Sequence, residues 1–86
     1  MKEQWRERSR PVRLERRYEF QDYNSLRDFL DRAADLSERE GLYPDMGFGR
    51  DYVNMTIHAE DGEEALSNEK HQFAQQLDTL ADEITN

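Results

Sequence analysis

The stretch VRLERRYEF, residues 12–20, alternates apolar and charged side chains with a period of two. Its apolar side chains fall on one face of an extended chain, at Val12, Leu14, Tyr18 and Phe20. Such alternation is typical of a β-strand with one buried face. Arg16 interrupts the apolar row, and its aliphatic stem can lie along the apolar surface while the guanidinium reaches water. The stretch therefore predicts a half-buried strand.

The segments on either side predict a partner strand and a helix. Upstream, EQWRER at residues 3–8 suggests a short strand joined to the first by a turn at SRP, residues 9–11. Downstream, the apolar period becomes helical in residues 21–40, with returns at Leu26, Phe29, Leu30, Ala33 and Leu36. Asp22, Asn24 and Ser25 all suit an N-cap, and Ser25 followed by Asp28 imitates a capping box. Gly41 is placed to end the helix in a left-handed conformation.

The second half of the chain predicts further strands followed by a second helix. DMGFGRD, residues 45–51, reads as an irregular strand edge or a hairpin turn. The stretch DYVNMTIHA, residues 51–59, alternates again, and EDGEE, residues 60–64, forms an acidic loop. Ser67 caps a last helix with a single apolar stripe at Phe73, Ala74, Leu77, Leu80, Ala81 and Ile84. The order of elements predicts one domain, residues 1–86, of the α+β class: a two-layer sandwich of a four-stranded antiparallel sheet with two helices packed on one face.

Composition excludes several classes of protein. Eighty-six residues favour one small domain, and the absence of cysteine leaves no disulfide framework or zinc–thiolate cluster. The amino terminus is charged from its second residue and lacks the apolar stretch that a signal peptide requires, and no later segment resembles a membrane span. The net charge of −8 argues against general nucleic-acid binding. We expect a soluble, cytoplasmic protein.

The charge is unevenly spread along the chain. Residues 1–18 hold seven Lys and Arg against three Glu, a net of +4, whereas residues 19–86 hold five against seventeen acids, a net of −12. This asymmetry is consistent with a directed contact with a large partner. The more common cause of such an asymmetry is that the charges only solvate an exposed face.

A few side chains are candidates for chemistry or recognition. His58 and Glu60, two apart on a predicted strand, could share a metal ion or proton with His71, or serve as surface polar residues. GFG at residues 47–49 lacks the lysine and helix start of a phosphate loop and reads as a turn. Tyr43 and Phe48 bracket Pro44 and form either an exposed aromatic patch for a partner or a cover for the sheet edge. Trp5 is expected to pack into the core and to hold the first strand against it.

The order of elements resembles the pterin-4a-carbinolamine dehydratase family. The likeness covers nearly the whole chain and rests on Trp5 and on five short stretches: RRYEF, FLDRAADLSE, YP, YVNMTI, and LSNEKHQFAQQLDTL with its Leu-Ser cap. The resemblance implies an enzyme that dehydrates a hydroxylated tetrahydropterin with three histidines as acid–base groups and substrate contacts. Imidazole suits this role because its pKa lies near neutrality. Carried across, the adjacent histidines fall on Leu42 and Tyr43, and the third falls on Glu60. All three positions therefore lack an imidazole. His58 lies two residues before Glu60, about 6.6 Å along the strand, and so does not replace the third histidine.

The missing histidines make the chain similar to a degenerate branch of that family, associated with the α-carboxysome and understood to assemble Rubisco. This resemblance implies a non-enzymatic assembly factor without a cofactor or metal, a cytoplasmic or carboxysome-associated location, and Rubisco subunits as partners. The implied contact surfaces are a vestigial pocket with Leu42, Tyr43, Pro44, Phe48 and Glu60, and a basic strand face with Arg13 and Arg17. A free sheet edge favours a homo-oligomer such as a dimer. Two alternatives stay open: a dehydratase with a remodelled site that uses His58 and Glu60, and a dimerising co-regulator.

Overall fold

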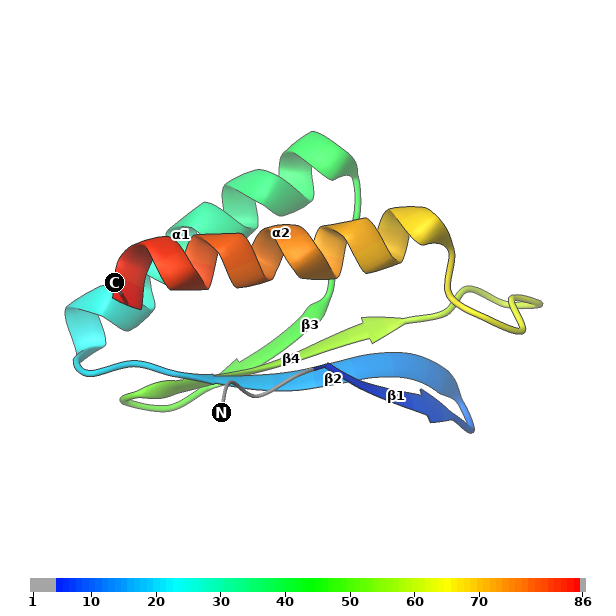
Figure 1. Ribbon diagram of the computed structural model, residues 1–86, viewed down its shortest axis with the longest axis horizontal. Coiled ribbons are helices and arrows are strands. Elements are labelled where there is room, and N and C mark those ends of the chain that lie inside the picture. The colour runs from blue at the N-terminus through cyan, green and yellow to red at the C-terminus, as the bar shows by residue number, and fades with distance from the viewer. Residues whose placement is uncertain (1–4, 86) are drawn as a thin grey trace.

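The computed structural model describes residues 5–85, which form a four-stranded sheet covered on one face by two helices (Figure 1). In chain order the elements are β1 (Arg6–Ser9), β2 (Val12–Glu19), α1 (Tyr23–Glu40), β3 (Asp45–Phe48), β4 (Tyr52–His58) and α2 (Asn68–Thr85). The strands lie in the order β1-β2-β4-β3, and each neighbouring pair is antiparallel. The predicted α+β sandwich is confirmed. No helix within residues 5–85 combines the length and apolar character that crossing a membrane requires.

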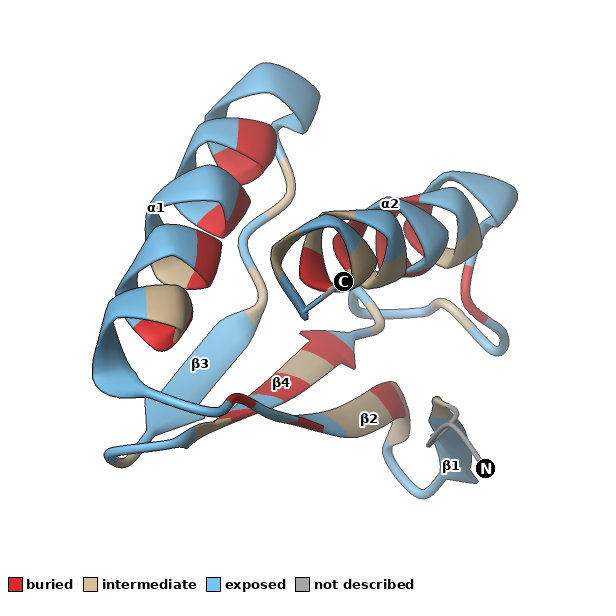
Figure 2. Cartoon of the chain, turned by 60° about the vertical axis from the view of Figure 1, so that its left-hand side comes forward, coloured by how far each residue is buried: buried red, intermediate tan, exposed pale blue. Residues whose placement is uncertain are grey.

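The register between β2 and β4 decides which side chains face the helices. Leu14 stands opposite Ile57 and Tyr18 opposite Val53, and these four side chains are buried. Residues directly opposite on neighbouring strands point to the same face of a sheet, and alternate residues point to the other face. The odd-numbered residues between Arg13 and Glu19 therefore face away from the helices. Figure 2 shows the buried positions gathered where the helices and the sheet face each other.

Both long strands end one residue earlier than the sequence predicts. β2 ends at Glu19 and β4 at His58, so that Phe20 and Ala59 lie just beyond them. Each still makes a backbone hydrogen bond, from Phe20 N to Asp51 O at 2.8 Å and from Ala59 N to Val12 O at 3.1 Å. DMGF forms the edge strand β3, which confines the turn to residues 49–51. Ser9, expected in a turn, is the last residue of β1, and the predicted strand residues 3 and 4 lie outside the described residues.

The ends of α1 follow from its capping residues. Of the three candidate N-caps, Asp22 fills the position: its backbone is extended and its carboxylate accepts a hydrogen bond from Ser25 N at 2.8 Å. The predicted capping box is not formed, because Asp28 instead accepts from Arg32 Nε, one turn along, at 3.1 Å. Gly41, with φ 70°, closes the helix, and its N–H donates to Ser37 O. The helix thus ends at Glu40 as predicted.

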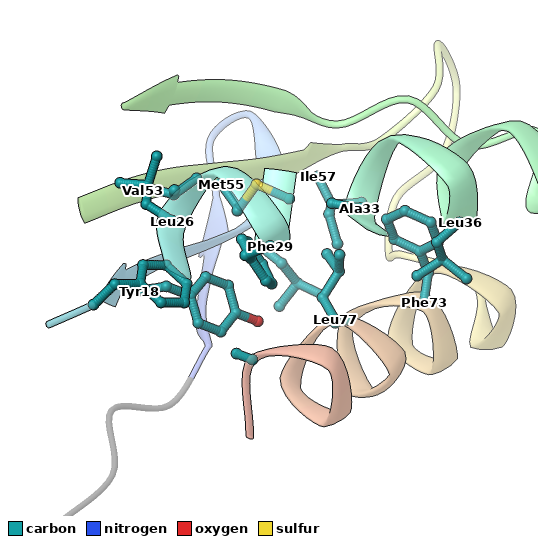
Figure 3. Packing of buried hydrophobic residues seen from close by; sticks show 14 of the residues in the cluster. Tyr18, Leu26, Phe29, Ala33, Leu36, Val53, Met55, Ile57, Phe73 and Leu77 are labelled. Carbon is teal, nitrogen blue, oxygen red and sulfur yellow. The ribbon is translucent and has the colours of Figure 1, made fainter. Parts of the chain in front are cut away.

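The core forms between the apolar stripes of the helices and the inner face of the sheet (Figure 3). Ser67 caps α2 as predicted, with its hydroxyl accepting from Lys70 N at 3.3 Å. The largest side chains with almost no exposed surface are Phe29, Phe73, Leu26, Leu36, Met55, Leu77 and Val53. Leu80 and Ile84 are only partly buried, although they belong to the predicted stripe. The buried apolar residues of α2 are therefore Phe73, Ala74, Leu77 and Ala81.

The carboxylate of Asp78 on α2 ties the helix layer to the sheet. Its Oδ1 accepts hydrogen bonds from Trp5 Nε1 at 3.0 Å, from Arg16 Nη1 at 2.6 Å and from Tyr18 OH at 2.5 Å. Burial, and then the hydrogen bond to Asp78, raise the pKa of Tyr18, so this phenol stays protonated. Trp5 packs against the core as predicted, at a ring-centroid distance of 6.1 Å from Tyr18. Arg16 therefore points inward, and its charge is neutralised within the protein rather than in water.

We expect Asp78→Ala to lower the free energy of unfolding by about 2–3 kcal/mol, because it leaves the guanidinium of Arg16 and two further donors without their acceptor. Tyr18→Phe, which removes one donor only, should cost about 1 kcal/mol. Urea unfolding followed by circular dichroism measures both changes. Asp35→Ala, which removes an exposed aspartate of α1, is the matched control and should unfold with the wild type. Equal midpoints for Asp78→Ala and Asp35→Ala would contradict the role of this carboxylate.

Candidate functional site

A recess of about 310 Å³ brings together most of the predicted pocket. It lies where the loop after α1 meets the end of β4 and the start of α2. Its lining includes Leu42, Tyr43, Pro44 and Glu60, four residues that are distributed over two separate parts of the sequence. The remaining lining residues are Gly41, Ile57, His58, Ala59, Lys70 and Phe73. Phe48, Arg13 and Arg17 are not part of this lining, so the predicted site residues occupy more than one surface.

Leu42 and Tyr43 take opposite roles although they are neighbours. Leu42 is partly buried and packs against the hydrophobic core, whereas the Tyr43 side chain is 73% exposed. The left-handed Gly41 directs the chain out of α1, and Pro44 then restricts the backbone before β3 begins. Tyr43 therefore does not fill the pocket. It presents an aromatic ring to the solvent beside the recess, which suits recognition of a partner.

A buried lysine holds the acidic loop at the floor of the recess. Lys70 is 5% exposed, and its Nζ donates to Glu63 Oε1 at 2.7 Å. Glu63 also accepts from Glu60 N at 2.9 Å and Ser67 N at 3.1 Å. The hydrogen bond from Lys70 holds the pKa of Glu63 below its ordinary value. The sequence predicted only an acidic loop here, since an isolated lysine beside a helix start carries no signal that it is buried.

The histidines are not placed to form a metal site. β4 ends at His58, so Glu60 does not share a strand face with it as predicted. His58 Nε2 lies 2.7 Å from Asp45 Oδ2 of the neighbouring strand, and His71 Nε2 lies 3.7 Å from Glu7. Within residues 5–85 no group of three His, Cys, Asp or Glu side chains is arranged to hold a metal ion.

The other predicted residues lie outside the recess. Phe48, at the end of edge strand β3, is 55% exposed and does not cover the edge by packing into the core. Arg13 and Arg17 stand opposite His58 and Asn54 on the sheet face that the helices leave uncovered. His58, which lines the recess, stands opposite Arg13 and so connects the recess with this uncovered face of the sheet.

The chain belongs to the pterin 4 alpha carbinolamine dehydratase family, whose profile matches residues 1–80. A curated protein of Rubrobacter xylanophilus, provisionally assigned as a pterin-4-alpha-carbinolamine dehydratase, is 30% identical over 69 residues. That match covers 78% of this chain and 62% of the Rubrobacter protein. The chain therefore spans less than two thirds of the length of its curated relative.

Two solved structures share the fold. One is a pterin dehydratase-like protein identified as a Rubisco assembly factor in the alpha-carboxysome, with a TM-score of 0.83 and 39% identity over 92% of this chain and 90% of the other. The second is a transcriptional coactivator/pterin dehydratase from Brucella melitensis, with a TM-score of 0.79 and 19% identity over 90% of this chain and 81% of the other. At that identity the Brucella protein shows the fold alone.

The Lys70–Glu63 pair predicts a pH-dependent contribution to stability. Because the pKa of Glu63 in the folded protein lies below its ordinary value of 4.5, the stabilisation is present above about pH 4.5 and is lost as the pH falls through the depressed pKa. Glu63→Gln should therefore lower the urea midpoint at neutral pH, and the difference from wild type should shrink below about pH 4. Glu64→Gln changes the neighbouring exposed residue and is the matched control. Identical pH profiles for the two variants would contradict the assignment.

Proposed function

We propose that this chain is a Rubisco assembly factor that uses the dehydratase scaffold without dehydratase chemistry, in association with the carboxysome. The observation that carries the proposal is the 39% identity, over 92% of this chain, to a pterin dehydratase-like Rubisco assembly factor. The match also covers 90% of the other chain. The likeness therefore concerns the whole described domain rather than one shared motif.

The chemistry of the recess supports a non-enzymatic role. The three positions that the family resemblance assigns to histidine are Leu42, Tyr43 and Glu60. Leucine cannot transfer a proton, and the ordinary pKa of tyrosine is about 10. The histidine that does line the recess, His58, is engaged with Asp45. General acid–base catalysis needs groups of suitable pKa within reach of the substrate, and these replacements leave a surface better suited to binding.

An assembly factor needs only differential binding. A protein that binds a partly assembled subunit more tightly than the finished complex shifts the population toward productive intermediates and is then released. The contact residues that we propose are Leu42, Tyr43, Pro44 and Glu60 at the recess, Phe48 on the edge strand, and Arg13 and Arg17 on the basic strand face. Tyr43 is the most exposed large apolar side chain among residues 5–85, which makes it the best candidate for an anchor.

Co-expression with Rubisco large and small subunits in a foreign host tests the proposal. We expect the chain to raise the yield of soluble assembled Rubisco, and Tyr43→Ala to reduce that gain while keeping the fold. Truncation of an interface aromatic costs more than about 1 kcal/mol, or about fivefold in binding. Tyr23→Ala, which removes a tyrosine that is 50% exposed on α1, is the matched control. Native gel electrophoresis quantifies the assembled complex.

The remodelled dehydratase remains the alternative, because the Rubrobacter relative carries that assignment and His58 lines the recess. Rubisco yield that does not change with the protein would contradict the assembly function. Dehydration of a hydroxylated tetrahydropterin above the uncatalysed rate, lost in His58→Ala, would instead establish the enzyme.

We also propose that two copies pair through the β3 edge. Met46 and Phe48 stand opposite Met55 and Val53, on the helix side of the sheet, yet they are 38% and 55% exposed. An edge strand with exposed apolar side chains and unpaired backbone groups favours addition of another strand. Sedimentation should give the mass of a dimer for the wild type and of a monomer for Phe48→Lys, with Tyr23→Lys unchanged. A monomeric wild type would rule out this pairing.

A further inference from the structure

The sheet face opposite the helices is uncovered and carries an ordered set of arginines, which we call the basic face. Both helices lie on the other side of the sheet (Figures 1 and 2). The registers of β1 with β2 and of β2 with β4 place a common set of side chains on the uncovered face: Arg6, Arg8, Arg13, Glu15, Arg17, Glu19, Tyr52, Asn54, Thr56 and His58. A recess of about 340 Å³ opens among them. The face is thus hollowed as well as charged.

The arginines of the basic face are crowded in a way that the fold does not require. Arg8 stands directly opposite Arg13, and like charges in that position are destabilising. Glu15 relieves the repulsion by accepting from Arg13 Nε at 2.9 Å and from Arg8 Nε at 3.2 Å, and these bonds hold its pKa below the ordinary value. One carboxylate therefore serves two guanidinium groups, and each guanidinium keeps further N–H donors beyond that bond.

The guanidinium group of Arg17 is oriented by stacking on an aromatic ring. Arg17 Cζ lies 4.1 Å from the centroid of the Tyr52 ring on the neighbouring strand. A guanidinium held over an aromatic ring is fixed in its plane while its N–H edge stays open to an acceptor. Its ion pair with Glu19 is long, at 3.5 Å, and both side chains are well exposed. Arg17 is therefore poised to exchange this weak partner for a better one.

The charge of the basic face opposes the charge of the rest of the protein. Strands β1 and β2 give the basic face four arginines against the two glutamates Glu15 and Glu19, a net of +2, in a chain whose net charge is −8. The exposed side of α1, in the other layer, carries acidic residues at Asp28, Asp31, Asp35 and Glu38. Arg27, Arg32 and Arg39 lie among these acids, so α1 as a whole is acidic while the uncovered face of the sheet is basic. This asymmetry orients an approaching negative partner.

We propose that the basic face docks an acidic segment of a partner protein, held by carboxylates that displace Glu15 and Glu19 from the arginines. Guanidinium groups bind carboxylates through two parallel hydrogen bonds, and replacement of one carboxylate by another needs no rearrangement of the arginines. A protein segment fits better than nucleic acid, because Glu15 and Glu19 lie within the face and the acidic remainder of the chain repels a continuous row of phosphates. The inference deepens the proposed function and rests on it for the source of the segment, a Rubisco subunit.

The test is fluorescence anisotropy with a short labelled peptide that alternates glutamate with threonine. We expect the wild type to bind it with an affinity that falls as salt increases. Arg13→Glu with Arg17→Glu should weaken binding by about tenfold or more, the factor that corresponds to 1.4 kcal/mol. Arg27→Glu with Arg39→Glu, on α1, makes the same change of formal charge and should alter the affinity by less than about twofold. Circular dichroism checks the folds, and Arg13→Gln with Arg17→Gln replaces the first pair if it unfolds.

Three results would overturn the proposal. Failure of the wild type to bind the peptide would show that the basic face is not a docking surface for acidic segments. An equal loss of affinity in the two Arg→Glu double variants would show that binding depends on total charge rather than on the basic face. Tighter binding of an oligothymidylate of equal charge than of the peptide, lost in Arg13→Glu with Arg17→Glu, would identify the ligand as a nucleic acid. The Rubisco yield assay separates this inference from the proposed function: peptide binding without any gain in yield would refute only the latter, and a gain that survives Arg13→Glu with Arg17→Glu would refute the contact of this face with Rubisco.

Discussion

The carboxylate of Asp78 fixes the helix layer on the sheet, and the rest of the structure depends on that contact. β2 turns its alternate side chains toward the helices, but one of them is the charged Arg16. A guanidinium in that position needs an acceptor inside the protein, and Asp78 supplies it while also receiving Tyr18 and Trp5. Apolar packing alone would allow α2 to slide along the sheet, whereas a three-donor contact with one oxygen defines a single position.

The position of α2 in turn sets the geometry of the recess. Asp78 holds the middle of the helix, and Lys70, two turns earlier, is bound to Glu63 in the loop that precedes it. Since Glu63 also accepts from the backbone of Glu60 and Ser67, the loop between β4 and α2 has little freedom to move. The recess is therefore shaped by polar contacts of its own lining residues Lys70 and Glu60, and substitutions at its exposed residues, such as Tyr43, can occur without loss of the fold.

The sequence predicted the elements well and the contacts between them poorly. Alternation around Leu14 and the helical stripe around Leu77 arise from local periodicity, which any single segment displays. The role of Arg16 could not be predicted, because a guanidinium in an apolar row can snorkel to water as readily as it can find a partner 62 residues away. The same holds for Lys70, whose burial depends on a loop that folds back over it. The sequence predicts the end of β4 one residue late because Ala59 continues the apolar alternation. In the structure only one backbone hydrogen bond, from Ala59 N to Val12 O, continues the pairing beyond His58.

A partial separation of core from recess helps to explain how one scaffold can carry different functions. Core side chains such as Phe29 and Leu77 do not line the recess, although Phe73 and Ile57 do, and the exposed Tyr43 contributes nothing to the core cluster. Selection on binding can therefore change the exposed residues of the recess, the β3 edge and the basic face with little effect on the core. Membership in a dehydratase family fixes the scaffold, and the function must be argued from the side chains that the scaffold presents.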